Sequence, residues 1–396
     1  MKLPKNLLRS LTIWCVLFWS ANSYALQINY TMDLEWRGFT DTSSVQERFN
    51  RDVSVGFETE FRTSFNDGNT TLTFTPFGRW DSRDPERRHY DIRELNLIHA
   101  AGDWEFQGGI SKVFWGVAES NHLVDVINQT DYLENIDGED KLGQKMIQVS
   151  RSFEQSTLSA FILPGFRERE YRSSDDPLAL PFKVIEEAQY ESDDGNSHID
   201  YAIRYSGYYA SIDYGVSFFS GTSREPDFIP GDTPGEFVAY YPQMDQFSVD
   251  IQVTDDAWLW KLEAIRRKYS QRSFNAVVAG LEYSIYGMAD GLFDLGLIAE
   301  YHYDDRGDPA AVTFQNDLFL GMRFGFNDAE SSEILAGAFY DFDDQSSAIR
   351  IEANRRLTNN AKISIEAQLF TNVDIGNITY GLRHSDYILL SLQYFF

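Results

Sequence analysis

Apolar and polar residues alternate over long stretches of the chain. The clearest stretch is Leu26–Arg37, in which the even positions are apolar and the odd positions are polar. Strict alternation over this length predicts a β-strand with one apolar and one polar face. Strands in globular proteins are usually about six residues long, whereas a tilted membrane-spanning strand needs about nine to eleven. The length of this stretch therefore favours a strand that crosses a membrane.

Similar alternation recurs through the rest of the chain and predicts 18 strands, with 16 as the alternative count. The connections between the predicted strands alternate in length. Short turns rich in Asn, Asp and Gly alternate with longer loops, such as 116–144, 164–198 and 221–244. Short turns at one rim and long loops at the other are typical of an antiparallel transmembrane β-barrel. The predicted strands are 26–37, 51–65, 71–80, 90–100, 104–115, 145–153, 157–163, 199–206, 210–219, 246–254, 258–266, 274–284, 292–303, 315–326, 333–341, 347–357, 361–370 and 386–396.

The polar faces of these strands carry charges that need water. In 258–265, Trp258 and Trp260 alternate with Lys261 and Glu263, so the apolar side would face lipid and the charged side the interior. A dry interior is excluded, because each buried unpaired charge costs several kcal/mol. Backbone groups in hydrocarbon must all be paired, so the sheet has to close. A closed barrel of 18 strands is wide enough for an aqueous channel, whereas about eight strands fill the interior with side chains.

Composition and charge narrow the function further. The 396 residues include 8 Trp, 22 Tyr and 30 Phe, and the net charge is −27. The acidic balance argues against a nucleic-acid partner. Amphipathic rings at strand ends suit the two boundaries between lipid and water. The aromatic residues that we expect at the membrane interface are Trp36, Trp80, Trp104, Trp258, Tyr301 and Phe396.

The first 25 residues differ from the rest. Lys2, Lys5 and Arg9 precede an apolar stretch at 11–20, and Ser23–Ala25 provides small residues at a cleavage position. This order is typical of a secretory signal peptide. We therefore expect a signal peptide at 1–25 and a barrel at 26–396, with the single cysteine, Cys15, removed with the signal.

Together, the signal, the alternating segments and the final strand resemble a Gram-negative outer-membrane porin. In the final strand, Ile388, Leu390, Leu392, Tyr394 and Phe396 alternate and end on an aromatic ring. A weaker local likeness to outer-membrane channel families lies in the Trp-Gly step that ends Gly109–Gly116. The resemblance implies passive diffusion of small hydrophilic solutes through the outer membrane, contact with lipid and lipopolysaccharide, and recognition of the last strand by the assembly machinery. A homotrimer is also possible, since many porins are trimers.

Loop 117–144 is the best candidate for a constriction, because in porins an early long loop commonly folds inward. Its segment 123–128 is apolar enough to pack against an inner wall. If the loop does so, its carboxylates would raise the local concentration of cations, and opposed charges on the wall would create a transverse field. A solvated external loop is the alternative, and each wall charge could instead belong to a structural salt bridge. The candidate pore-lining residues are Glu119, Asp125 and Asp131 of the loop and Arg62, Arg79, Glu94, Glu105, Arg323 and Arg350 of the wall.

Two other functions are open to such a barrel, namely a structural or adhesive role and hydrolysis. The sequence contains neither Gly-x-Ser-x-Gly nor His-Glu-x-x-His. His384, Ser385 and Asp386 are consecutive, and neighbours on a strand face opposite ways, so they do not form a triad by themselves. Asp137–Asp140 lacks the ligand spacing of an EF-hand loop. We therefore expect no enzyme activity, cofactor or metal site.

Overall fold

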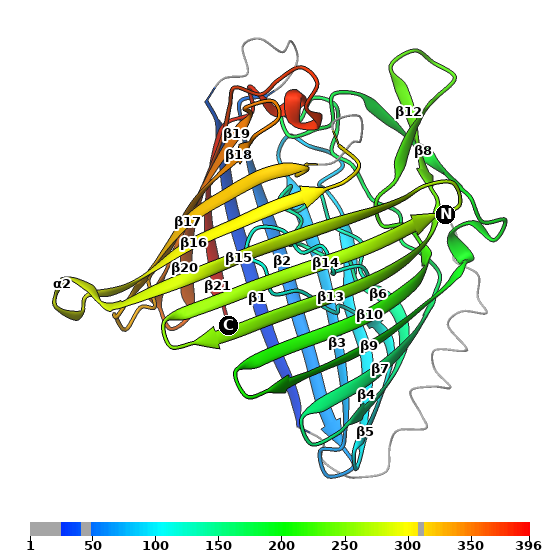
Figure 1. Cartoon of the computed structure of the whole chain (residues 1–396), viewed down its shortest axis with the longest axis vertical. Helices are drawn as coiled ribbons and strands as arrows, with labels where there is room; N and C mark the ends of the chain where they lie inside the picture. The colour runs from blue at the N-terminus through cyan, green and yellow to red at the C-terminus, as the bar shows by residue number, and fades with distance from the viewer. Residues whose placement is uncertain (1–24, 41–48, 308–312) are drawn as a thin grey trace.

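The computed structural model describes residues 25–40, 49–307 and 313–396. The predicted signal peptide therefore lies outside the described residues, apart from Ala25. The described part forms one closed barrel of 18 antiparallel strands, as predicted, and a separate sheet of three strands (Figure 1). The barrel strands are β1 (Leu26–Phe39), β2 (Arg51–Phe65), β3 (Thr70–Asp81), β4 (Tyr90–Ala101), β5 (Trp104–Ser111), β6 (Gln144–Ser152), β7 (Ser156–Pro164), β9 (Ile199–Tyr209), β10 (Ile212–Thr222), β13 (Gln243–Asp255), β14 (Trp258–Tyr269), β15 (Ser273–Gly287), β16 (Phe293–Asp304), β17 (Asn316–Phe326), β18 (Glu333–Asp341), β19 (Ser347–Thr358), β20 (Ala361–Thr371) and β21 (Tyr387–Phe395).

The barrel closes between its first and last strands. Each barrel strand pairs with the next along the chain, and β21 pairs with β1, with Trp36 opposite Leu390. Beyond the end of β21, Tyr30 and Phe396 exchange two backbone hydrogen bonds of 2.9 and 3.1 Å. Closure leaves no unpaired sheet edge, which is the condition for a sheet to lie in hydrocarbon. No helix within the described ranges is long and apolar enough to cross a membrane.

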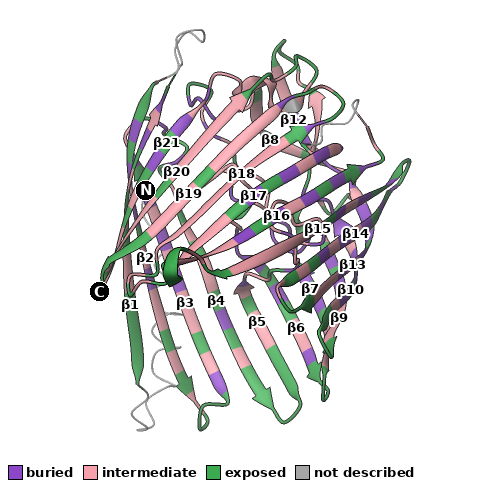
Figure 2. Ribbon diagram, turned by 60° about the vertical axis from the view of Figure 1, so that its left-hand side comes forward, coloured by how far each residue is buried: buried purple, intermediate pink, exposed green. Residues whose placement is uncertain are grey.

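The two faces of the sheet differ as the alternation predicts. On β14, Trp258 and Trp260 are 39% and 47% exposed on the outside, whereas Lys261 and Glu263 are 8% and 0% exposed on the inside. Exposed and less exposed residues alternate in the same way along many strands (Figure 2). A continuous apolar outer surface of this kind is unfavourable in water and suits lipid.

The connections between strands define two rims. Short turns such as Asn66–Asn69 and Asp256–Ala257 form one, called here the short-turn rim, and the opposite ends of the strands form the long-loop rim.

One turn lies later in the chain than the predicted position at 206–208. Strand β9 runs to Tyr209, and the turn lies at Ala210, where φ is 53°. Gly207 is a strand residue that approaches Gln155 closely, since a Cβ there would lie 2.5 Å from the Gln155 carbonyl oxygen.

Two predicted loops contain regular structure that the alternation did not indicate. Strands β8 (Lys183–Tyr190), β11 (Asp227–Pro230) and β12 (Glu236–Tyr241) form the small sheet, which projects from the long-loop rim (Figure 1). It is held to the barrel loops by a cluster that includes Phe166 and Tyr241. Three short helical turns complete the described structure, namely η1 (Gly195–Ser197), α2 (Met288–Gly291) and η2 (Ile378–Leu382).

Candidate functional site: the loop across the lumen

The connection between β5 and β6, residues 112–143, is called here the lumen loop. Strand β5 ends at Ser111, four residues before the predicted end at 115, because the chain leaves the sheet and Val113 N–H donates to the Asn128 side chain at 2.9 Å. Val124 and Ile127 of the loop are fully buried. They belong to a cluster with side chains of the inner wall on seven strands, including Phe161, Phe219, Ile265 and Ala276. The lumen loop therefore packs against the inside of the barrel.

Two buried carboxylates of the wall bind the backbone of the lumen loop. Glu263 on β14 accepts the N–H groups of Val117 and Ala118 at 2.7 and 2.9 Å, and that of Val124 at 3.2 Å. Glu300 on β16 accepts the N–H groups of Glu119 and Ser120 at 2.7 and 2.9 Å, and the Ser120 hydroxyl at 2.5 Å. Glu263 and Glu300 are 0% and 1% exposed, so these charge-assisted bonds replace the water that each carboxylate loses. The loop is thereby fixed to one side of the lumen.

The contact with Glu263 requires a glycine and brings a histidine close. Gly116 has a φ of 136°, and a Cβ there would lie 2.8 Å from Glu263 Oε1. His122 Nε2 lies 3.1 Å from Glu139, and its Nδ1 lies 3.9 Å from Glu263. Burial disfavours the protonated ring, but the two carboxylates outweigh this effect and raise the pKa of His122 to about 10. The imidazole is therefore charged at neutral pH.

On the opposite wall, Arg79 of β3 holds Glu134 of the lumen loop. Its Nε and Nη2 donate to Glu134 Oε1 and Oε2 at 2.9 and 2.8 Å. Arg93 on β4 approaches Glu134 to 3.2 Å, and Arg79 also pairs with Asp33 and Glu35 of β1. Burial raises the pKa of the Glu134 carboxyl, but the two arginines more than offset this and hold it below its usual range.

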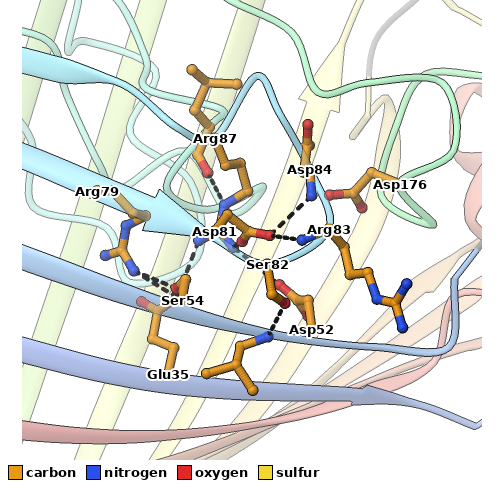
Figure 3. A network of polar contacts seen from close by, with 12 residues as sticks. Glu35, Asp52, Ser54, Arg79, Asp81, Ser82, Arg83, Asp84, Arg87 and Asp176 are labelled. Carbon is orange, nitrogen blue, oxygen red and sulfur yellow. Dashed lines mark hydrogen bonds and ion pairs between the residues drawn. The ribbon is translucent and has the colours of Figure 1, made fainter.

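Arg87 extends this network to the outer ends of β1–β3 (Figure 3). Its buried guanidinium lies 2.7 Å from Asp81, 3.2 Å from Asp52 and 3.1 Å from Glu35, and it also donates to the Leu133 carbonyl at 2.8 Å. The network thus binds the lumen loop through backbone as well as side chains. A second long loop joins through Arg172, which donates to the carbonyls of residues 132–134 and to Asp176.

Two further arginines complete the anchorage. Arg323 on β17 pairs with Glu119 at 2.6 Å, and Arg350 on β19 pairs with Asp137 at 2.6 Å. In the circular order of the barrel, β3 is the third strand and β14 the eleventh of 18, so the strands that bind the loop lie on nearly opposite sides. The lumen loop therefore crosses the interior.

The structure gathers some of the predicted pore residues and separates others. Glu119, Arg79, Arg323 and Arg350 all take part in contacts between loop and wall. Asp125 and Asp131 are buried within the loop region, where Asp125 pairs with Lys141 at 3.4 Å. Three predicted wall residues take no part in the described ion pairs between the loop and the wall, namely Arg62, Glu94 and Glu105. Glu105 lies next to a short turn, away from the long-loop rim.

The sequence interpretation missed the contributions of Glu263, Arg87, Arg93 and His122 to the anchorage of the loop.

His89, Asp131 and Glu134 form a group that could be considered for metal binding. One potential ligand atom of each residue lies within 4.8 Å of those of the other two. Glu134 is already neutralised by two arginines, whose charges oppose a cation at this point. This triad therefore does not favour a metal.

The predicted interface aromatics all lie on the outer surface. Their exposed fractions range from 39% to 55%, and Phe396 stacks on Tyr30 with ring centroids 5.3 Å apart. Their placement at the lipid boundary remains a prediction. The six residues are Trp36, Trp80, Trp104, Trp258, Tyr301 and Phe396.

No protein-family model and no curated protein sequence matches this chain. Solved structures do. A BenF-like porin from Pseudomonas fluorescens Pf-5 has a TM-score of 0.57 at 9% identity, covering 94% of this chain and 98% of that one. The chain has the fold of a Gram-negative outer-membrane porin.

Two further solved structures are similar to this chain over most of its length. OccAB3 of Acinetobacter baumannii has a TM-score of 0.56 at 9% identity, covering 94% of this chain and 99% of its own. OccK5 (OpdH) of Pseudomonas aeruginosa has a TM-score of 0.54 at 9% identity, covering 93% and 97%. At this identity the porin likeness concerns the fold, and substrate and mechanism have to be argued from the residues of this chain.

Proposed function

We propose that the protein is an outer-membrane channel through which small hydrophilic solutes diffuse passively, and that the lumen loop narrows this channel. The observation that supports it most directly is the anchorage of the loop to nearly opposite walls, through Glu263 and Glu300 on one side and Arg79 on the other. An element fixed in this way reduces the cross-section that is open to a solute. It does so without chemistry or an energy source.

The narrow part would be lined by charges of both signs. Arg323 is 31% exposed and lies between Glu119 at 2.6 Å, Glu333 at 2.9 Å and Glu282 at 3.7 Å. Lys261 Nζ also lies 3.5 Å from Glu119, so three carboxylates around two cationic side chains leave an excess of one negative charge. Such a surface raises the local concentration of cations and retards anions. We therefore propose a moderate preference for cations, carried by Glu119, Glu282 and Glu333 rather than by the buried Asp125 and Asp131.

Solute uptake into proteoliposomes tests this function. Purified protein is reconstituted, and swelling is followed with neutral solutes of increasing size. The proposal predicts fast swelling with small sugars, a sharp decline with size, and a higher size limit when Glu263→Gln and Glu300→Gln release the loop. Vesicles that swell no faster than protein-free vesicles would contradict a channel.

One hydrogen bond between the described loop and wall joins a serine to a histidine, which is the contact that a hydrolase could use. Ser120 Oγ lies 2.9 Å from His302 Nε2 and donates to Glu300. In a hydrolytic triad the histidine is oriented through its second nitrogen, but within the described ranges His302 Nδ1 has no hydrogen-bond partner. Glu300 also uses the Ser120 hydroxyl to anchor the loop, which favours a structural role for this contact.

The partners follow from the same proposal. Lipid and lipopolysaccharide would contact the apolar outer face, and the assembly machinery would recognise β21, whose outward side chains include Leu390, Leu392 and Tyr394. A homotrimer is the proposed oligomer. Native mass spectrometry in mild detergent distinguishes a trimer from a monomer.

A further inference from the structure

Two carboxylates face each other near the long-loop rim, and the described part of the chain gives them no basic partner. Asp317 of β17 and Asp341 of β18 are directly opposite across the two strands, next to the start of β17 and at the end of β18. Both are buried, at 3% and 2% exposure. Like charges directly opposite on a sheet repel each other. Most buried carboxylates described above are paired with arginine, or bind several loop N–H groups, but neither Asp317 nor Asp341 occurs in the ion pairs of the described residues.

The hydrogen bonds that these carboxylates accept come from neutral groups. Asp341 Oδ1 accepts the N–H groups of Asp343 and Asp344 at 2.7 and 3.3 Å, and Asp317 Oδ2 accepts that of Asn316 at 3.1 Å. The charged groups on adjoining elements are engaged elsewhere. Arg306 is bound by Asp304 at 2.6 Å and lies 3.6 Å from Glu225. Among the described residues, the two buried carboxylates thus lack a counter-charge.

An independent observation is the amide of Gln315, which shares the inner face of this chain segment with Asp317. Gln315 is 7% exposed, and its Nε2 donates to Asp341 Oδ2 at 3.3 Å, which places the amide beside that carboxylate. Its Oε1 is buried and has no hydrogen-bond donor among the described groups. A buried acceptor left unsatisfied costs about 1–3 kcal/mol. Rotation of the amide by half a turn would present this oxygen at the position now held by Nε2.

We propose that Asp317, Asp341 and Gln315 bind a divalent metal cation. The donors are two carboxylates and one amide carbonyl, which are hard oxygen ligands of the kind that Ca²⁺ prefers, with water completing the coordination. Softer metals that favour imidazole or thiolate are not matched. His302, the strand neighbour opposite Asp317, directs its Nε2 to Ser120 instead.

The cation would link neighbouring loops at the mouth of the barrel. Asp343 and Asp344 lie two and three residues after Asp341 and accept hydrogen bonds from the side-chain amides of Asn316 and Asn377 at 2.8 and 2.9 Å. Their charges add to the negative potential at the proposed site without being required as ligands. This inference concerns the stability of the rim, and it does not depend on whether the barrel conducts.

Calorimetric titration of the full-length protein in detergent, after removal of metals with a chelator, tests the proposal. Ca²⁺ is expected to bind with one site per chain and more tightly than Mg²⁺, and to raise the melting temperature Tm. Asp341→Asn and Asp317→Asn should each weaken Ca²⁺ binding by at least about tenfold, because each removes a ligand charge. Gln315→Met should weaken it less.

A matched control is Asp305→Asn, which also removes one acidic charge at the same rim. Asp305 is exposed and accepts hydrogen bonds from Asn275, so this variant should keep the Ca²⁺ affinity of the wild type. Without Ca²⁺, Asp341→Asn should melt at a higher temperature than the wild type, because it removes the repulsion. This gain shows that the variant folds. The proposal is overturned if the wild-type protein binds no Ca²⁺ at millimolar concentration, which is the result expected if the two carboxylates share a proton instead. It is also overturned if Asp341→Asn binds Ca²⁺ with the affinity of the wild type.

Discussion

The substitution Glu263→Gln tests how firmly the lumen loop is held. The carboxylate is fully buried and accepts three loop N–H groups, from Val117, Ala118 and Val124. A hydrogen bond to a charged group contributes about 1.5–3 kcal/mol. Glutamine can still accept through Oε1, but its NH₂ group would face the N–H of Val124, and the negative charge that balances His122 is lost. We expect the anchored state to lose about 2–4 kcal/mol, because one favourable contact is replaced by two facing donors.

Hydrogen–deuterium exchange measures this loss directly. A change of about 2–4 kcal/mol corresponds to an increase of about 30- to 700-fold in local opening, confined to the backbone amides of 117–124. Glu282→Gln is the matched control, because Glu282 also lies on the inner wall but pairs with Arg323 and not with the loop backbone. Exchange at 117, 118 and 124 that is equal in both variants and the wild type would refute the anchoring role of Glu263.

Four further predictions follow from the same contacts. Glu119→Gln should shift the reversal potential in a salt gradient towards lower cation preference, whereas Asp125→Asn, whose side chain is fully buried, should shift it less. The pKa of His122, about 10, lies above the ordinary 6.5, so the stabilisation that the charged imidazole gives to the anchored loop is complete below about pH 6.5 and is lost as the pH rises through about 10. His122→Gln should abolish this pH dependence of hydrogen exchange in the loop. Arg79→Met should destabilise the barrel by about 3–5 kcal/mol in denaturant titrations, because it leaves Glu134 buried without its main partner, and a change below 1 kcal/mol would contradict this. Phe396→Gly should reduce the folded fraction on cold gel electrophoresis, since it removes ring contacts with Tyr30 and Phe57 across the closing strands.

The barrel could be predicted from the sequence because lipid on one side and water on the other impose a period of two on every strand. Trp258 to Glu263 carries this information without any distant partner. Strand ends were less predictable. Gly207 suggested a turn, but it is needed because the chain passes close to Gln155, a neighbour that only the folded sheet creates.

The lumen loop was predictable in part. Its apolar residues, such as Val124 and Ile127, suggested packing against a wall, and the structure places them there. The matching signal on the wall is a break in alternation, as at Ala264–Ile265, where two successive residues are apolar because both faces of the strand meet apolar surroundings. The partners of Glu263 and Arg79 could not be predicted, because these contacts join residues 146 and 55 positions apart, and their register depends on the closed barrel.

Conductance in planar lipid bilayers tests the central claim most directly. Purified wild-type protein should insert in discrete steps of ohmic current, and Glu263→Gln should give larger or noisier steps because the loop is less firmly held. A correctly folded barrel that inserts but carries no current above the bare bilayer would contradict a channel function for this protein.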